Sequence, residues 1–203
     1  MKKMSALDRV LLLITGLLAA YQIVVGVEGA SALSMWAYTI AFGVLLVAGL
    51  LLIIMGFSVL DSPLVVIVST IIPLSLSFGL VAQYAPQYTT LYGIFVVLGF
   101  LAIVYTRLTP STPKKWAIIV LAVVHGIAGL VIFLLPIILA LKGVMPGGFA
   151  LVGVGGALIG VGGLLLAFLK AGKPILSQKT ILTVLPGLLL LMAAAFVAGF
   201  AAV

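Results

Sequence analysis

The chain has 203 residues, of which 66% are hydrophobic and only 6% are charged, and its mean hydropathy is +1.53. A water-soluble domain of this size could not cover its surface with so few polar side chains, so the composition indicates a protein embedded in lipid. The formal net charge is +7. The basic residues occur in short clusters beside apolar runs, which is typical of membrane topology and argues against a nucleic-acid partner. Cysteine is absent, which excludes disulfides, thiolate nucleophiles and cysteine-ligated metals.

Seven stretches are long and apolar enough to cross a hydrocarbon core about 30 Å thick. They cover approximately residues 9–27, 35–59, 63–83, 89–107, 115–140, 147–169 and 180–202. The first stretch, between Lys2-Lys3 and Ala30-Ser31-Ala32, also resembles a cleavable secretory signal. We expect it to be retained, because it takes part in an internal duplication described below.

Several loops carry residues that favour the start of a helix. Ser62-Pro63 and Thr112-Pro113 each place a hydroxyl at an N-cap and a proline at the first helical position. Ser177 precedes the last span in the same way. We therefore expect these three hydroxyls to cap helices.

The distribution of lysine and arginine predicts the orientation. If the N-terminus is cytoplasmic, nine of the ten basic residues fall inside and only Lys142 falls outside, as the positive-inside rule expects. The inside residues are Lys2, Lys3, Arg9, Arg107, Lys114, Lys115, Lys170, Lys173 and Lys179. Without the span at 89–107 the later lysines would fall outside, so the charges support seven spans. We expect a multi-pass protein of the cell membrane with the N-terminus inside and the C-terminus outside.

An internal repeat runs along the chain. The segment VLLLITG at 10–16 returns as VLAVVHG at 120–126, Gly49-Leu-Leu-Leu returns as Gly163-Leu-Leu-Leu, and Thr70-Ile-Ile-Pro73 returns as Thr183-Val-Leu-Pro186. The offsets are 110, 114 and 113 residues. This order and spacing predict an all-α membrane protein with two parallel three-helix repeats and one linker helix, a 3+1+3 plan. Within one membrane domain at 1–203, the units would cover 1–87 and 113–203, with the linker at 88–112.

At the level of architecture, the 3+1+3 plan resembles the SWEET sugar facilitators and the vitamin-precursor transporters of similar shape. The paired Pro-Gln signature of the SWEET and PQ-loop families belongs within helices, whereas Pro86-Gln87 falls in a predicted outer loop here. The resemblance therefore concerns topology alone.

The repeated Thr-x-x-Pro motif is the most specific polar feature. Pro73 lies ten residues past Pro63, which places it about 15 Å into the membrane. In one interpretation, hydroxyls near this depth line a solute pathway, and Pro73 and Pro186 act as hinges. In the other, which we favour, the prolines shape packing and each hydroxyl bonds the backbone of its own helix. The candidate pathway residues are Thr15, Thr70, Ser75, Ser77, His125 and Thr183.

His125 is the only histidine and should also lie near the middle of the bilayer. Ionisable residues at that depth need partners and are functional candidates by default. Two interpretations stay open: His125 lines a solute pathway, or it bonds a neighbouring helix. A single histidine cannot provide both axial ligands of a haem, and no carboxylate or thiolate is expected beside it, so we expect no metal and no cofactor.

The sixth span is rich in glycine. Gly153, Gly156, Gly160 and Gly163 are spaced to share one helix face, and Gly156 to Gly160 forms a G-x-x-x-G pattern. A phosphate-binding loop is excluded because no Lys-Ser or Lys-Thr follows. The pattern predicts close helix packing, within the chain or between protomers.

The sequence leaves two functions open. The sequence argues against an enzyme, because no buried carboxylate pair, Ser-His-acid set or acidic Mg²⁺ cluster is expected. The first function, which we favour from sequence, is a small-solute facilitator or channel that uses a cleft between the two units. The second is a non-catalytic structural or accessory subunit that packs against its own copies or against other membrane subunits, with lipid around it. The first predicts a polar cavity near Thr70, His125 and Thr183, whereas the second predicts that these residues are packed and satisfied.

Overall fold

The computed structural model describes residues 3–109, 114–170 and 175–203, and every regular element in these ranges is helical. Seven of the helices are long and apolar enough to cross a membrane. They are α1 (Ala6–Val25), α2 (Ala32–Met55), α3 (Pro63–Tyr84), α4 (Thr89–Leu108), α5 (Lys114–Leu141), α6 (Ala150–Lys170) and α7 (Gln178–Phe200). Three short 3-10 helices, η1 (Gly56–Asp61), η2 (Pro86–Tyr88) and η3 (Gly147–Phe149), join them. Helices satisfy all their backbone hydrogen bonds locally, which is why an apolar chain can enter lipid in this form.

The predicted spans agree with the apolar helical spans to within a few residues. The second span, expected at 35–59, consists of α2, which ends at Met55, and of η1, which continues it to Asp61. Gly56 has a φ of 73°, in the left-handed region that terminates α-helices and that glycine adopts without steric cost. The chain continues as η1, whose Phe57 and Val59 side chains are buried.

Of the predicted helix caps, one forms a hydrogen bond in the structure and another does not. Ser177 caps α7, because its Oγ accepts a hydrogen bond from the backbone N–H of Thr180 at 3.1 Å. Ser62 occupies the N-cap position of α3 with Pro63 as the first helical residue, but the Ser62 side chain makes no capping hydrogen bond. The cap predicted at Thr112-Pro113 lies outside the described residues.

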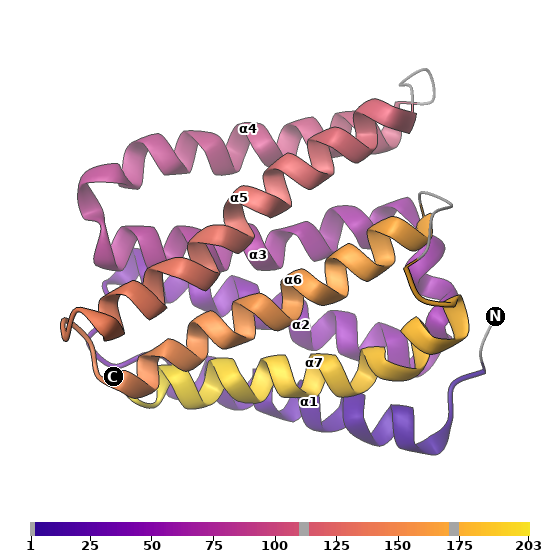
Figure 1. Cartoon of the computed structure of the whole chain (residues 1–203), viewed down its shortest axis with the longest axis horizontal. Helices are drawn as coiled ribbons and strands as arrows, with labels where there is room; N and C mark the ends of the chain where they lie inside the picture. Colours follow the sequence, from indigo (N-terminus) through magenta and orange to yellow (C-terminus); the bar gives the residue numbers. More distant parts are fainter. Residues whose placement is uncertain (1–2, 110–113, 171–174) are drawn as a thin grey trace.

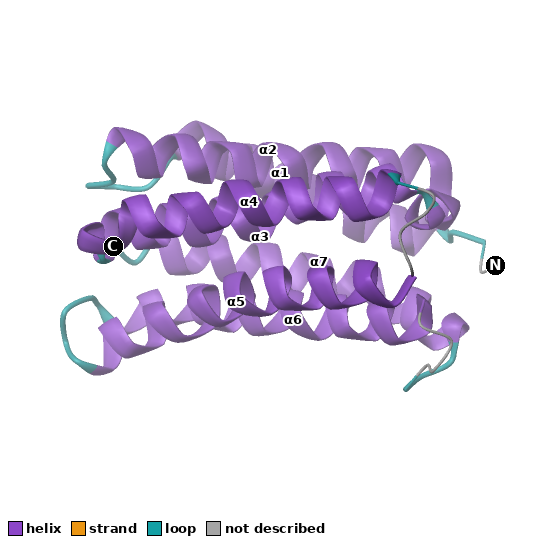
Figure 2. Ribbon diagram, turned by 90° about the horizontal axis from the view of Figure 1, so that it is seen from above, coloured by secondary structure: helices purple, strands orange, loops and turns teal. Residues whose placement is uncertain are grey.

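Six helices form a closed ring and α4 lies outside it. Around the ring, α1 packs against α2, α2 against α3, α3 against α5, α5 against α6, α6 against α7, and α7 against α1 (Figure 1). The remaining helix, α4, packs against α3 and α5. Seen from above, α1 and α2 lie on one side of the bundle and α5 and α6 on the other (Figure 2).

The two ends of the bundle differ in charge. The chain termini lie at opposite ends (Figure 1). Arg9 near the start of α1, Arg107 at the end of α4, Lys115 at the start of α5 and Lys179 at the start of α7 share the end that holds the N-terminus, which we call the basic end. Lys142 follows α5 at the opposite end. Two further basic residues of the predicted inside set, Lys2 and Lys173, lie outside the described residues.

Candidate functional site

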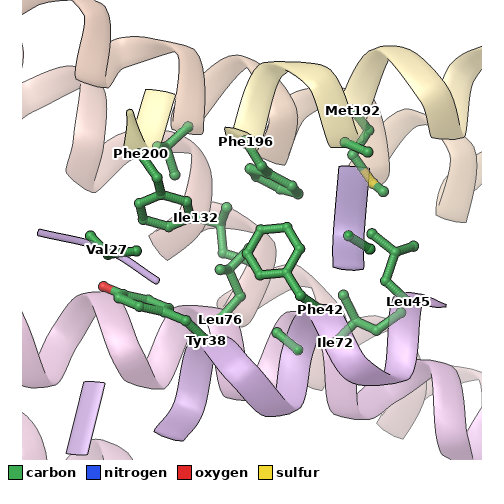
Figure 3. Close-up of a cluster of buried hydrophobic side chains, with 14 of the residues drawn as sticks. Val27, Tyr38, Phe42, Leu45, Ile72, Leu76, Ile132, Met192, Phe196 and Phe200 are labelled. Carbon is green, nitrogen blue, oxygen red and sulfur yellow. The ribbon is translucent and has the colours of Figure 1, made fainter. Parts of the chain in front are cut away.

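The space between helices α1–α3 and helices α5–α7 is occupied by a buried apolar cluster, which we call the central core. Its side chains come from both groups of helices and interlock in the middle of the ring (Figure 3). Those labelled in Figure 3 are Val27, Tyr38, Phe42, Leu45, Ile72, Leu76, Ile132, Met192, Phe196 and Phe200. Each is at most 7% exposed, so this part of the chain is packed as a protein interior.

Aromatic rings connect the two groups of helices across the central core. Phe42 of α2 packs edge-on against Phe196 of α7, with ring centroids 6.3 Å apart and an interplanar angle of 90°. Tyr38 packs against Phe200 at 4.9 Å on the same pair of helices. Such pairs contribute about 0.5–1.5 kcal/mol beyond the area they bury. A solute could pass here only by displacing these rings.

The candidate hydroxyls bond the backbone of their own helices. A hydroxyl that donates to the carbonyl one turn back is satisfied without a ligand. The bonds run from Thr15 to the Leu11 carbonyl at 2.9 Å, from Thr70 to Val66 at 2.7 Å, from Ser75 to Ile71, from Ser77 to Pro73 at 2.6 Å, and from Thr183 to Lys179 at 2.7 Å.

Thr70 and Thr183, which match in the repeat, lie in different surroundings. Thr70 is fully buried and shares a face of α3 with Ile67 and Leu74, which pack against α4 and α5. Thr183 is exposed on α7. The two threonines therefore differ in burial although they match in the repeat.

His125 is half-buried on α5, beside Val124, which packs in the same cluster against α3 and α4. Its Nδ1 atom is shielded and makes no hydrogen bond of acceptable geometry to the described residues, although the Leu121 carbonyl lies nearby. Arg107 of α4 lies close enough for an electrostatic interaction with the ring. His125 therefore belongs to the contact between α4 and α5 and lies away from the central core.

Three prolines are buried inside helices. Pro73 and Pro186 lie within α3 and α7, where we expected them, and Pro136 lies within α5. Pro136 is not among the predicted hinge residues, although its position inside the span predicted at 115–140 was a signal in the sequence. Each proline removes one backbone hydrogen bond from its helix.

The four predicted packing glycines of α6 separate into two pairs. A Cβ atom on Gly153 would lie 2.5 Å from the Phe133 carbonyl oxygen of α5, and one on Gly156 would lie 2.7 Å from Ile132. Gly160 and Gly163, further along α6, have no described atom within 4 Å of such a Cβ. Figure 1 shows α5 and α6 diverging toward the basic end, which accounts for this difference.

The glycines that bring α6 and α7 together are different from those predicted to pack α6. A Cβ on Gly155 would lie 2.6 Å from the Phe196 ring, and one on Gly162 would lie 2.7 Å from Leu188. On the facing helix, Gly199 lies against the backbone N of Val152, 2.6 Å from an added Cβ. The spacing of seven residues between Gly155 and Gly162 was the signal in the sequence, because it places both on one helix face.

At the basic end, an open pocket of about 250 Å³ lies where η1 meets the end of α6 and the start of α7. This pocket was not predicted from the sequence, because η1 lies more than 100 residues from the other segments that line it. Its lining residues are Phe57, Leu60, Asp61, Leu166, Leu169, Gln178 and Leu182.

No family model, curated protein or solved structure matches the chain.

The described interior consists largely of packed apolar side chains. Over residues 3–109, 114–170 and 175–203, no group of three or more His, Cys, Asp or Glu side chains is placed to hold a metal ion. The described residues form a filled centre, an outlying helix α4 and an open pocket at the basic end.

Proposed function

We propose that the chain is a non-catalytic structural or accessory subunit of a larger membrane assembly. The observation that carries this proposal is the filled central core, in which Phe42, Phe196 and their neighbours occupy the space a solute would need. The hydroxyls near this depth are already bonded to their own helices. The interior therefore supports a protein whose work is done at its surface.

The outer surface supports the same proposal. In α4, which the structure describes along its whole length, Gly99 and Ile103 alone are buried, so most of this helix is available to lipid or to a partner. On α6, Gly160 and Gly163 leave room for another helix to approach closely. Small residues of this kind favour helix association in membranes, because the backbones can come into contact.

We propose further that the bundle is a 3+1+3 duplication. Exchanging α1, α2 and α3 for α5, α6 and α7 converts each packed pair of the ring into another: α1–α2 into α5–α6, α2–α3 into α6–α7, and α3–α5 into α7–α1. The outlying α4 takes no part in the exchange. This list of contacts supports a two-fold axis near the membrane normal. The positive charge of the basic end supports a cytoplasmic placement of that end, in the cell membrane.

Native mass spectrometry after gentle extraction tests the subunit proposal. We expect the chain to be recovered with further copies of itself or with other membrane proteins, and Gly160→Leu with Gly163→Leu to release it as a folded monomer. Gly43→Leu on α2 is the matched control, because a Cβ on Gly43 also meets no described atom. Quantitative recovery of the unaltered chain as a lone monomer in lipid would contradict the proposal.

A solute facilitator is the second candidate, and one observation favours it. Pro73 and Pro186 are buried at matching positions of α3 and α7, where bending would separate the two groups of helices. On this hypothesis the filled core represents an occluded state of the transporter. Liposomes that contain the chain should then swell faster than empty liposomes in a panel of sugars and polyols. Truncating the barrier with Phe42→Ala should raise that rate. Equal swelling of loaded and empty liposomes across the panel would eliminate the facilitator.

A further inference from the structure

The pocket at the basic end has an apolar wall and a polar rim. Phe57 and Leu60 of η1, Leu166 and Leu169 of α6, and Leu182 of α7 form the wall. Asp61 and Gln178 provide the polar lining. The volume of about 250 Å³ exceeds the roughly 150 Å³ that holds a benzene molecule, and it falls just below the range of about 300–1,000 Å³ typical of drug-sized ligands. The space therefore suits a short length of aliphatic chain together with a small polar head.

Asp61 is the carboxylate that this end of the bundle leaves available. Of the two acidic residues near the basic end, Asp8 takes part in the capping box of α1, where its Oδ2 accepts a hydrogen bond from the backbone N–H of Ser5 at 2.8 Å. Asp61 is exposed at the rim of the pocket, and within the described ranges no hydrogen bond or ion pair occupies its carboxylate. An ammonium group is the natural partner of such a carboxylate beside an apolar wall.

The charge around the pocket restricts the ligand further. Arg9, Arg107, Lys115 and Lys179 share this end, and Lys179 directly follows the pocket residue Gln178. A simple cation would be repelled by Lys179 beside the pocket, and a simple anion would be repelled by Asp61 at its rim. Charges separated by more than about 8 Å are largely screened at physiological salt, so these two nearby groups decide which charges a ligand can carry. A zwitterion with an ammonium group and a phosphate satisfies both.

We propose that the pocket binds an amphiphile with a zwitterionic ammonium-phosphate head, the chemistry of an aminophospholipid. The ammonium group pairs with Asp61, the first methylenes of the chain lie against the leucines of α6 and α7, and the phosphate faces Lys179 at the start of α7. This site is independent of the subunit proposal, because it is formed within one chain.

Lipid retention in native mass spectrometry tests the proposal. The purified chain is mixed with equal amounts of phosphatidylethanolamine and phosphatidylglycerol that carry the same acyl chains. We expect phosphatidylethanolamine to be retained about fivefold more, as for one ion pair at an exposed rim, and Asp61→Asn to bring the ratio near one. Glu28→Gln, at an exposed carboxylate of the opposite end, is the matched control and should keep the preference.

Two further measurements keep the test decisive. Gln178→Glu adds a carboxylate to the same rim and should raise the preference, which serves if Asp61→Asn fails to fold. A phosphoethanolamine lipid with a photoreactive group early in its acyl chain should label residues 57–61, 166–169 and 178–182. Free phosphoethanolamine should compete with this labelling only weakly if the natural ligand is a lipid. It should compete strongly if the natural ligand is a soluble metabolite. Equal retention of both lipids by the unaltered chain, or labelling spread over all helices, would overturn the proposal.

Discussion

Gln83 and Ser31 are joined by a hydrogen bond that ties α3 to the start of α2. The backbone N–H of Ser31 donates to the Gln83 Oε1 atom at 2.8 Å, and the Gln83 Nε2 atom donates in turn to the Gly29 carbonyl at 2.9 Å. One side-chain amide therefore satisfies two backbone groups of the loop between α1 and α2. Gln83 fixes that loop onto a helix more than fifty residues away.

Replacing Gln83 by leucine should loosen the α1–α2 loop. We expect the free energy of unfolding to fall by about 0.5–1.5 kcal/mol, because two hydrogen bonds at an exposed site are lost and water takes their place. Hydrogen–deuterium exchange of residues 28–33 should rise. Gln87→Leu, at an exposed position of η2, is the control and should leave exchange in this loop unchanged. Unaltered exchange in Gln83→Leu would show that the amide does not hold the loop.

Truncating Phe196 should destabilise the central core. Phe196→Ala removes a ring that is 1% exposed and that packs edge-on against Phe42, so we expect a loss of about 3 kcal/mol from the cavity left behind. Phe133→Ala, at a lipid-facing position that is 37% exposed, should cost much less. Steric trapping in bicelles gives both values. A double-mutant cycle with Phe42→Ala should yield a coupling of about 0.5–1.5 kcal/mol, and a coupling near zero would contradict the ring contact.

Alanine should have opposite effects at two glycines of α6. Gly153→Ala places a methyl group 2.5 Å from a backbone oxygen of α5, so the helices must separate, and we expect a loss of about 1–3 kcal/mol. Gly160→Ala meets no described atom and should gain up to about 1 kcal/mol from helix propensity. Thermal unfolding of each variant, purified as a monomer, measures the two changes in stability. Equal effects at both sites would mean that α5 does not approach α6 as the structure has it.

Two serines that precede helices should differ in their contribution to stability. Ser177→Ala removes the cap of α7 and should cost about 1 kcal/mol. Ser62→Ala removes a side chain that makes no capping bond, so its effect should stay within about 0.5 kcal/mol. Unfolding titrations in mixed micelles measure both changes. A larger loss at Ser62 than at Ser177 would reverse the assignment.

Leucine at His125 should stabilise the contact between α4 and α5. The shielded Nδ1 atom makes no hydrogen bond of acceptable geometry, and removing an unsatisfied polar group should raise the free energy of unfolding by about 1 kcal/mol. Gln22→Leu provides the contrast, because the Gln22 amide is buried and donates to the Gly26 carbonyl. That variant should lose stability by a similar amount. A loss of stability in His125→Leu would show that the ring is bonded to a neighbour.

The sequence by itself determined the class of protein and the positions of its helices. A chain in lipid must satisfy each backbone group nearby, so apolar runs of sufficient length become helices whatever surrounds them. Local chemistry also predicted the cap at Ser177, because that hydrogen bond joins residues three apart. The end of α2 at Met55 was harder to predict, since many glycines occur inside helices here and only some, such as Gly56, adopt a left-handed conformation.

The tertiary structure alone decided which faces of the helices meet. The spacing of Gly153 and Gly160 places them on one face of α6. In the structure α5 contacts α6 at Gly153 but diverges from it toward Gly160. This difference follows from the crossing angle between the two helices, which the spacing does not specify. Thr70 and Thr183 share a motif, yet one is buried and the other exposed, because α4 and α5 cover α3 whereas no described helix covers α7 at Thr183. The pocket at Asp61 has the same origin, since it forms where η1 meets the end of α6 and the start of α7, more than 100 residues away in the sequence. The periodicity of a sequence shows which side chains share one face of a helix. Whether that face contacts a second helix depends on how the two helices are placed relative to each other.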